Sequence, residues 1–261
     1  MGEAMNKVRL DVQDHVATVA LAAPKANILD EAMVMELAHA FAGLAARRDL
    51  NAVILTADGP HFSFGASVQE HLPGPVAGML QRFHALLRQI GETPAPTIAA
   101  IRGQCLGGGF ELALACDLII AEETAQLGCP EIKLAVFPPA ACVLLPLRVG
   151  SSRAAELVLT GASWSGAQAA AAGLVNRAVA AGELEQHLKE WLDQNLLAQS
   201  PAALRHALSA LRSATRRALE EELPKVERLY LEKLMAEPDA EEGLRAFLEK
   251  RPPHWRDGGA S

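Results

Sequence analysis

Two glutamates twenty residues apart, Glu111 and Glu131, are the residues of this chain best suited to acid–base chemistry. Each is the lone acidic residue of an apolar stretch, Leu106–Leu112 for the first and Gly128–Ile132 for the second. A carboxylate in such surroundings loses hydration, and its pKa tends to rise. The pair is therefore predicted to exchange protons near neutral pH.

Three consecutive glycines, 107–109, stand just before Glu111. They predict a sharp turn from a strand over Thr97–Ile101 into a helix over Gly107–Cys116. Free N–H groups and the helix dipole at such a start favour anionic oxygen, which suits an oxyanion hole for a developing enolate. Alternatively, the glycines only permit close packing of helix on strand, and Glu111 pairs with a structural Arg or Lys. The presence of Glu131 favours the catalytic interpretation.

Composition narrows the possible classes. With 261 residues, half of them hydrophobic, the chain can bury an α/β core and a smaller appended part. A net charge of -7 predicts no nucleic-acid partner, although a few local cations and N–H groups could still hold the phosphates of a ligand. No apolar run suits a bilayer span, and the N-terminal residues 1–7 lack the apolar core of a signal peptide. We therefore expect no membrane partner.

The cysteine pattern argues against a metal centre. Four cysteines occur without a C-x-x-C pair or a nearby histidine, which predicts no zinc site and a reduced, cytoplasmic protein: Cys105, Cys116, Cys129 and Cys142. No metalloprotease, P-loop or dinucleotide motif occurs either, so we expect no metal and no cofactor. Polar lining is the expected role of the possible nucleophiles Ser67, Cys105 and Cys142. Three histidines that could line a site, His61, His71 and His84, are left outside the predicted mechanism.

Strand and helix patterns alternate along the chain and predict an α/β core of parallel strands. A hairpin is expected first, and Asp30 is expected to cap a helix that runs to about Arg48. The further expected strands are 52–56, 97–101, 118–121 and 174–177, and the further helices are 76–91, 107–116, 138–149, 151–160 and 165–172. From Gly182 onward the pattern is helical. We predict a catalytic core over residues 1–199 and a helical region over 200–261.

Several motifs together resemble the crotonase (enoyl-CoA hydratase/isomerase) superfamily. The resemblance runs from about Val8 to Arg251, and its motifs lie at 103–113, 115–117, 127–134, 159–161 and 172–175. It implies a spiral of β-β-α turns with C-terminal helices that build homotrimers, often paired into hexamers. It also implies an acyl-CoA thioester as the substrate, with CoA as a part of that substrate.

The resemblance also assigns residues to roles. The backbone N–H groups of Ala66 and Gly108 correspond to the family's oxyanion hole. Glu111 and Glu131 correspond to the hydratase pair that positions and deprotonates water and then delivers a proton to carbon. Phe247 and Lys250 resemble residues that a subunit contributes to its neighbour's CoA site. The other residues that match CoA-contacting segments are Lys25, Ala26, Ile28 and again Ala66.

Two departures from the usual family pattern concern the acyl end of the site. Ser67 stands where the family usually has Asp, and Pro138–Cys142 replaces a glycine-rich turn. With the segments 26–30 and 61–73, these departures resemble the branch that hydrates cyclohexa-1,5-diene-1-carbonyl-CoA to 6-hydroxycyclohex-1-ene-1-carbonyl-CoA in anaerobic benzoyl-CoA degradation. The alternatives are a linear enoyl-CoA hydratase or isomerase of fatty acid β-oxidation, a thioester hydrolase, and a non-catalytic crotonase-like binding protein. The presence of both glutamates favours a hydratase.

Overall fold

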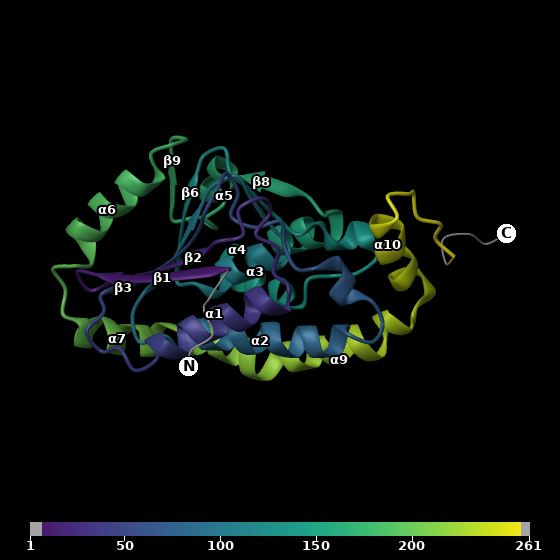
Figure 1. Ribbon diagram of the computed structural model, residues 1–261, viewed down its shortest axis with the longest axis horizontal. Coiled ribbons are helices and arrows are strands. Elements are labelled where there is room, and N and C mark those ends of the chain that lie inside the picture. The colour runs from purple at the N-terminus through teal and green to yellow at the C-terminus, as the bar shows by residue number, and fades with distance from the viewer. Residues whose placement is uncertain (1–6, 257–261) are drawn as a thin grey trace.

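Six strands form the main sheet of the computed structural model, which describes residues 7–256 (Figure 1). Their order is β1-β2-β3-β4-β6-β9. The first two strands form an antiparallel hairpin, and all the other neighbours in this sheet are parallel. The strands span Val8–Gln13 (β1), Val16–Leu21 (β2), Ala52–Ala57 (β3), Thr97–Ile101 (β4), Leu118–Glu122 (β6) and Arg177–Val179 (β9).

A second, smaller sheet holds three strands of three residues each: β5 (Gln104–Leu106), β7 (Gln126–Gly128) and β8 (Ser163–Ser165). β5 and β7 are parallel, and β7 and β8 are antiparallel. Two isolated parallel bridges, Ser63 to Cys105 and Leu29 to Ala66, extend the same pairing to earlier parts of the chain.

The chain winds as a spiral because each pass contributes one strand to the main sheet, one short pairing segment to the small sheet, and then a helix. The first two passes are β2, Leu29 and α1, and then β3, Ser63 and α2. The next two are β4, β5 and α3, and then β6, β7 and α4. These helices span Glu31–Leu44 (α1), Val76–Glu92 (α2), Gly108–Ala115 (α3) and Pro139–Thr160 (α4), with a kink in α4 at Gly150.

Helices cover both faces of the main sheet (Figure 1). The principal core lies between the sheet and α1, α2 and α3, and includes Phe41, Leu86 and Phe110. On the opposite face, α6 (Leu184–Asn195) buries Leu184, Leu188 and Leu192 against strand residues. This burial on both faces explains why the sequences of β3 and β4 are mostly apolar rather than alternating.

The C-terminal part is helical and packs back on the core. α9 lies alongside α2 at the lower edge of Figure 1 and also contacts α4, while α10 lies at the far end of the molecule. No helix within residues 7–256 has the length and apolar character that a membrane crossing requires. The remaining helices are α5 (Gly166–Ala171), α7 (Pro201–Leu211), α8 (Ser213–Arg217), α9 (Leu223–Glu232) and α10 (Pro238–Leu248), with short helical turns η1 (Val68–His71), η2 (Pro130–Leu134), η3 (Ala218–Glu222) and η4 (Leu234–Ala236).

The predicted α/β class is confirmed, as is the cap of α1, where the Asp30 side chain accepts a hydrogen bond from Met33 N–H. The last short strand, expected to start within 174–177, forms at the end of that range, but its expected beginning at Leu174 is wrong. Leu174 and Val175 instead donate backbone hydrogen bonds to Ala169 O and close the end of α5, so the strand begins only at Arg177. α1 ends at Leu44, its last buried residue, rather than near Arg48. The division at residue 200 stays a prediction, and residues 1–6 and 257–261 lie outside the described range.

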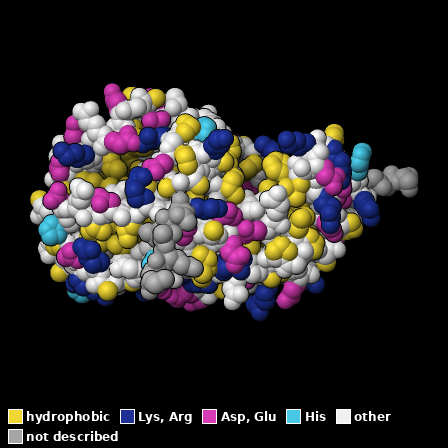
Figure 2. Space-filling view, in the orientation of Figure 1, with side chains coloured by type: hydrophobic (Ala, Val, Ile, Leu, Met, Phe, Trp, Pro, Cys, Tyr) yellow, Lys and Arg dark blue, Asp and Glu magenta, His cyan; other side chains and the backbone are white. Residues whose placement is uncertain are grey.

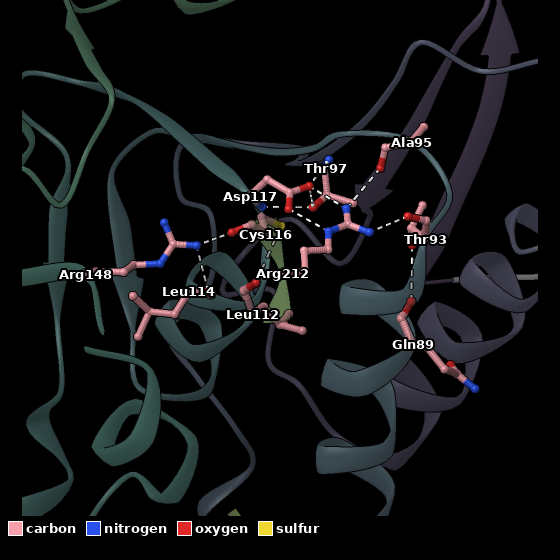
Figure 3. A network of polar contacts seen from close by, with 10 residues as sticks. All are labelled: Gln89, Thr93, Ala95, Thr97, Leu112, Leu114, Cys116, Asp117, Arg148 and Arg212. Carbon is pink, nitrogen blue, oxygen red and sulfur yellow. Dashed lines mark hydrogen bonds and ion pairs between the residues drawn. The ribbon is translucent and has the colours of Figure 1, made fainter. Parts of the chain in front are cut away.

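Arg212 ties the helical region to the core at the C-terminal end of α3 (Figure 3). Its guanidinium donates to Asp117 Oδ1 at 2.7 Å, to Thr93 O at 2.5 Å and to Ala95 O at 3.2 Å. Asp117 also accepts bonds from the backbone and side chain of Thr97. In the same view, Arg148 donates to the carbonyl oxygens of Leu114 and Cys116 at the end of α3.

We expect Arg212→Met to lower the free energy of unfolding by about 3 kcal/mol, because it leaves Asp117 charged and without its cation in a mostly buried place. Chemical denaturation measures this loss. Arg245→Met is the matched control, since Arg245 pairs with Glu241 on the exposed face of α10 and such pairs contribute about 0.5 kcal/mol or less. Equal losses in the two variants would contradict the anchoring role of Arg212.

Candidate active site

A cavity of about 810 Å³ opens where the glycine turn before α3, the segment η2 and the helix α10 meet. Its walls are mostly apolar, which strengthens electrostatic interactions inside it. The polar and charged side chains on it are few. They are Ser67, Gln69, His71, Glu111, Glu131, Lys133 and Arg251.

The spiral brings three of the predicted site residues together. Ala66, Gly108 and Glu131 come from three successive passes, and each follows shortly after the segment that pairs in the small sheet. Backbone hydrogen bonds hold these passes in register, including Leu106 N–H to Ser63 O at 3.0 Å and Gly107 N–H to Gly128 O at 2.9 Å. The small sheet therefore positions the site.

Two backbone N–H groups beside the glycine turn have no hydrogen-bond acceptor among the described residues. Within residues 7–256, neither the N–H of Ala66 nor that of Gly108 donates a hydrogen bond to another protein group. They lie close together, since a Cβ atom added to Gly108 would be 3.2 Å from Ala66 N. Gly65 and Gly107, the residues just before them, have φ values of +101° and +53°, which favour glycine. The arrangement offers two N–H groups to one anionic oxygen.

Glu111 lies in the first turn of α3 and is only 4% exposed. Its Oε1 accepts a hydrogen bond from Ala141 N–H at 2.9 Å, at the beginning of α4. Burial raises the pKa of Glu111, whereas this hydrogen bond and the nearby His84 oppose the rise. The unusual segment Pro138–Cys142 thus has a clear local role, because it supplies the N–H group that orients Glu111.

Glu131 lies in η2 with one carboxylate oxygen against the glycine turn. A Cβ atom added to Gly107 would be 2.6 Å from Oε1 of Glu131. Oε2 is buried and has no hydrogen-bond partner within the described residues. Burial and then the charge of Glu111 raise the pKa of Glu131 to about 8. Because only Glu111 receives a backbone hydrogen bond from α4, we infer that the proton of the pair resides on Glu131 at neutral pH.

This assignment predicts a fall in activity as the pH rises through about 8, where Glu131 loses its proton and can no longer act as an acid. Turnover against pH measures it, with circular dichroism at each pH as the control for folding. A rate that stays constant to well above pH 8 would contradict the assignment.

The raised pKa of Glu131 also makes the stability of the fold depend on pH, because it favours the protonated carboxyl group in the folded state. The stabilising contribution of this group is fully present below its ordinary pKa of 4.5 and is lost as the pH rises through about 8.

The predicted CoA-contacting residues divide into two groups. Ala26, Ile28, Ala66 and Phe247 line the cavity. Lys25 and Lys250 are exposed and do not line it. Phe247 lines the cavity of its own chain and is 55% exposed, and its contribution to a neighbouring subunit stays a prediction.

Sequence reasoning missed several residues of the walls. Among the residues that the structure describes, Lys133 and Arg251 are the two Lys or Arg side chains that line the cavity, although Arg251 is also paired with Glu242. His71, which was left outside the mechanism, lines the cavity as well, and its Nδ1 lies 2.8 Å from Ser67 O. Burial lowers the pKa of His71 and so favours its neutral form. The sequence placed Ser67 and Lys133 inside motifs of the site, but gave no comparable signal for Arg251.

His84 and Tyr230 lie behind the cavity wall. His84 is fully buried, and its Nδ1 lies 2.5 Å from Oε2 of Glu227 in α9. Tyr230, also in α9, is fully buried against Phe137, which lines the cavity. Neither residue belongs to the site that the sequence predicts.

The outer surface carries charges of both signs. On the face shown in Figure 2, basic and acidic side chains are interspersed.

Among residues 7–256, no group of three His, Cys, Asp or Glu side chains is arranged to hold a metal ion. The expected lack of a cofactor and of a nucleic-acid partner remains a prediction.

Comparisons with known proteins find a matching family model and several similar chains. Residues 11–258 match the family model described as enoyl-CoA hydratase/isomerase. The chain is 44% identical to the cyclohexa-1,5-dienecarbonyl-CoA hydratase of Thauera aromatica, covering 98% of this chain and 100% of that protein. It is 34% identical to the 2,3-dehydroadipyl-CoA hydratase of Escherichia coli, covering 97% and 99%. A crystal structure of an enoyl-CoA hydratase from Mycobacterium avium subsp. paratuberculosis superposes with a TM-score of 0.87 at 27% identity, covering 97% of this chain and all of that one.

Proposed function

Because the chain belongs to the enoyl-CoA hydratase/isomerase family, we propose that it is a hydratase that adds water to a conjugated dienoyl-CoA thioester. The observation that carries this proposal is that one cavity contains all the predicted catalytic groups. It holds two buried carboxyl groups, both with pKa values raised by burial, beside two free backbone N–H groups. An isomerase or hydrolase of this fold needs only one of those glutamates, and a binding protein needs neither.

In the proposed reaction, the N–H groups of Ala66 and Gly108 hold the thioester oxygen as negative charge develops on it. Glu111, which is ionised, accepts a proton from the attacking water molecule. Glu131, which is protonated, delivers its proton to carbon. The enolate that forms between the two steps is stabilised by the two N–H groups in an apolar cavity, where such hydrogen bonds are stronger than in water.

We propose cyclohexa-1,5-diene-1-carbonyl-CoA as the acyl substrate and 6-hydroxycyclohex-1-ene-1-carbonyl-CoA as the product, in the anaerobic degradation of benzoyl-CoA. Two observations support a pocket unlike that of a linear-chain hydratase. Ser67 lines the cavity, and Pro138 and Pro139 form part of its wall. The high identity to the Thauera protein over the full chain supports the same substrate. A linear enoyl-CoA hydratase is the alternative, supported by the weaker likeness to the Escherichia coli protein.

The remaining parts of the proposal concern binding and assembly. CoA lies along Ala26, Ile28 and Phe247, and the cavity-lining cations Lys133 and Arg251 contact its phosphates. No cofactor takes part, since acid–base groups and N–H donors suffice for hydration. The protein works in the cytoplasm as a homotrimer or a dimer of trimers. The free state of all four cysteines supports a reducing compartment.

An assay panel of cyclic dienoyl-CoA and linear enoyl-CoA thioesters, with no added cofactor, tests the proposal through the loss of enoyl-thioester absorbance. We expect the cyclic diene to be hydrated and crotonyl-CoA to be a poor substrate. Preference for crotonyl-CoA would favour the linear alternative, and no reaction with any thioester would favour a binding protein. Size-exclusion chromatography with light scattering tests the trimer.

A further inference from the structure

Tyr230 is the only tyrosine of the chain and is fully buried in α9. Its ring packs edge to face against Phe137, with ring centroids 5.2 Å apart and an interplanar angle of 71°. It belongs to a cluster of buried apolar side chains that also contains Leu80, Val136 and Leu244, and all three of these line the cavity. The ring of Tyr230 therefore supports the cavity wall from behind.

The hydroxyl group of Tyr230 is buried and has no hydrogen-bond partner within residues 7–256. Oε2 of Glu131, a residue that lines the cavity, is also buried and without a hydrogen-bond partner within the described residues. An unpaired buried hydroxyl is costly, and buried water molecules typically bond to groups of this kind. The two groups are complementary, because one carries a hydrogen-bond donor and the other an acceptor.

Packing brings these two residues into the same region, because Val136, which belongs to the cluster around Tyr230, donates its backbone N–H to Glu131 O at 3.3 Å. Burial raises the pKa of the Tyr230 hydroxyl, and the charges of Glu131 and Glu111 raise it further. The two carboxylate oxygens of Glu131 also lie at different distances from the glycine turn. A Cβ atom on Gly107 would be 2.6 Å from Oε1 but 3.9 Å from Oε2. Oε1 is thus the oxygen beside the turn that carries the free N–H of Gly108.

We propose that Tyr230 is a positioning residue for Glu131. Its hydroxyl group donates, through one buried water molecule, to Oε2 and so keeps the carboxyl proton on Oε1, beside the glycine turn. This inference rests on the proposed function of Glu131 as the proton donor. Tyr230 does not touch the substrate; it determines which oxygen of Glu131 presents the proton to the substrate carbon.

The first test is Tyr230→Phe, which removes the hydroxyl and keeps the ring against Phe137. We expect kcat to fall about tenfold, the effect of one neutral hydrogen bond, with KM changed less than about twofold. Thr93→Val is the matched control, since it removes another buried hydroxyl, one that donates to Gln89 O away from the cavity. A kcat for Tyr230→Phe equal to that of this control would overturn the proposal.

The second test needs no turnover. Growth with 3-fluorotyrosine labels this chain at one position only, and the protein gives a single ¹⁹F resonance from Tyr230. We expect Glu131→Gln to move that resonance and Glu241→Gln, on α10, to leave it in place. An unmoved resonance in Glu131→Gln would overturn the contact. If the resonance moves but the wild-type protein hydrates no thioester, the proposed function fails while the contact with Glu131 stands.

Discussion

Replacement of Glu131 by glutamine is expected to lower kcat by about 100- to 10,000-fold, because the amide cannot deliver a proton to carbon. The same range is expected for Glu111→Gln, which removes the base that orients and deprotonates water. Glutamine is nearly isosteric with glutamate, so the cavity keeps its shape. Single-turnover measurement of hydration, with the thermal midpoint recorded for each variant, separates lost chemistry from lost folding.

Glu241→Gln is the control for this pair, since Glu241 lies on α10 and pairs with Arg245 outside the cavity. It should retain wild-type turnover. Because the two glutamates act in one reaction, the double variant should lose little more than the worse single variant. Wild-type turnover in either Glu111→Gln or Glu131→Gln would contradict the paired-carboxylate mechanism.

Gly108→Pro is expected to cost roughly 3 kcal/mol or more of transition-state stabilisation, because proline has no N–H group to offer the enolate oxygen. Proline is tolerated at the first position of a helix, which is where Gly108 stands in α3, so the helix itself can form. The ratio kcat/KM measures the loss.

Crowding needs its own control, since a Cβ atom at position 108 would lie 3.2 Å from Ala66 N and 3.3 Å from the Ala66 side chain. Gly108→Ala introduces that Cβ atom and keeps the N–H group. We expect the alanine variant to lose less activity than the proline variant, and the difference estimates the contribution of the donor. Equal activity in the two variants would remove Gly108 from the oxyanion site.

The parts of the fold that the sequence predicted are those with a strong local signal. The β1–β2 hairpin and the Asp30 cap follow from apolar patterning and capping chemistry. β5, β7 and β8 were missed because three residues are too short to show alternation, and because their hydrogen bonds come from other passes of the chain. The missed sheet is the one that brings Ala66 and Gly108 together.

A similar division applies to the site. Glu111 and Glu131 were predictable because a lone acid in an apolar stretch marks a desolvated carboxyl group. Arg251 and Tyr230 were not predictable, since only tertiary packing brings Arg251 to the cavity and Tyr230 to the back of its wall. The role of Ala141 N–H as the hydrogen-bond donor to Glu111 also depends on how α4 begins against α3.

The position of the added proton distinguishes the proposed reaction from an ordinary hydration. In the cyclic diene, water attacks ring carbon 2, and the negative charge spreads from the thioester oxygen through carbon 1 to carbon 5. Protonation at carbon 5 completes a 1,4-addition. In the renumbered product the hydroxyl is on carbon 6 and the new hydrogen is on carbon 3, away from the hydroxyl-bearing carbon. Simple addition across one double bond would instead place hydroxyl and hydrogen on adjacent carbons.

The most direct measurement is hydration of cyclohexa-1,5-diene-1-carbonyl-CoA in deuterated water, with NMR to locate the label and with turnover compared against crotonyl-CoA. A carboxyl pair positioned for 1,4-addition to the cyclic diene is poorly positioned for addition across the single double bond of crotonyl-CoA. A misplacement of about 1 Å can lower the rate on the order of 100-fold. We predict deuterium at carbon 3 of 6-hydroxycyclohex-1-ene-1-carbonyl-CoA and slow turnover of crotonyl-CoA. Deuterium on a carbon adjacent to the hydroxyl-bearing one, or faster turnover of crotonyl-CoA, would contradict the proposed substrate and reaction.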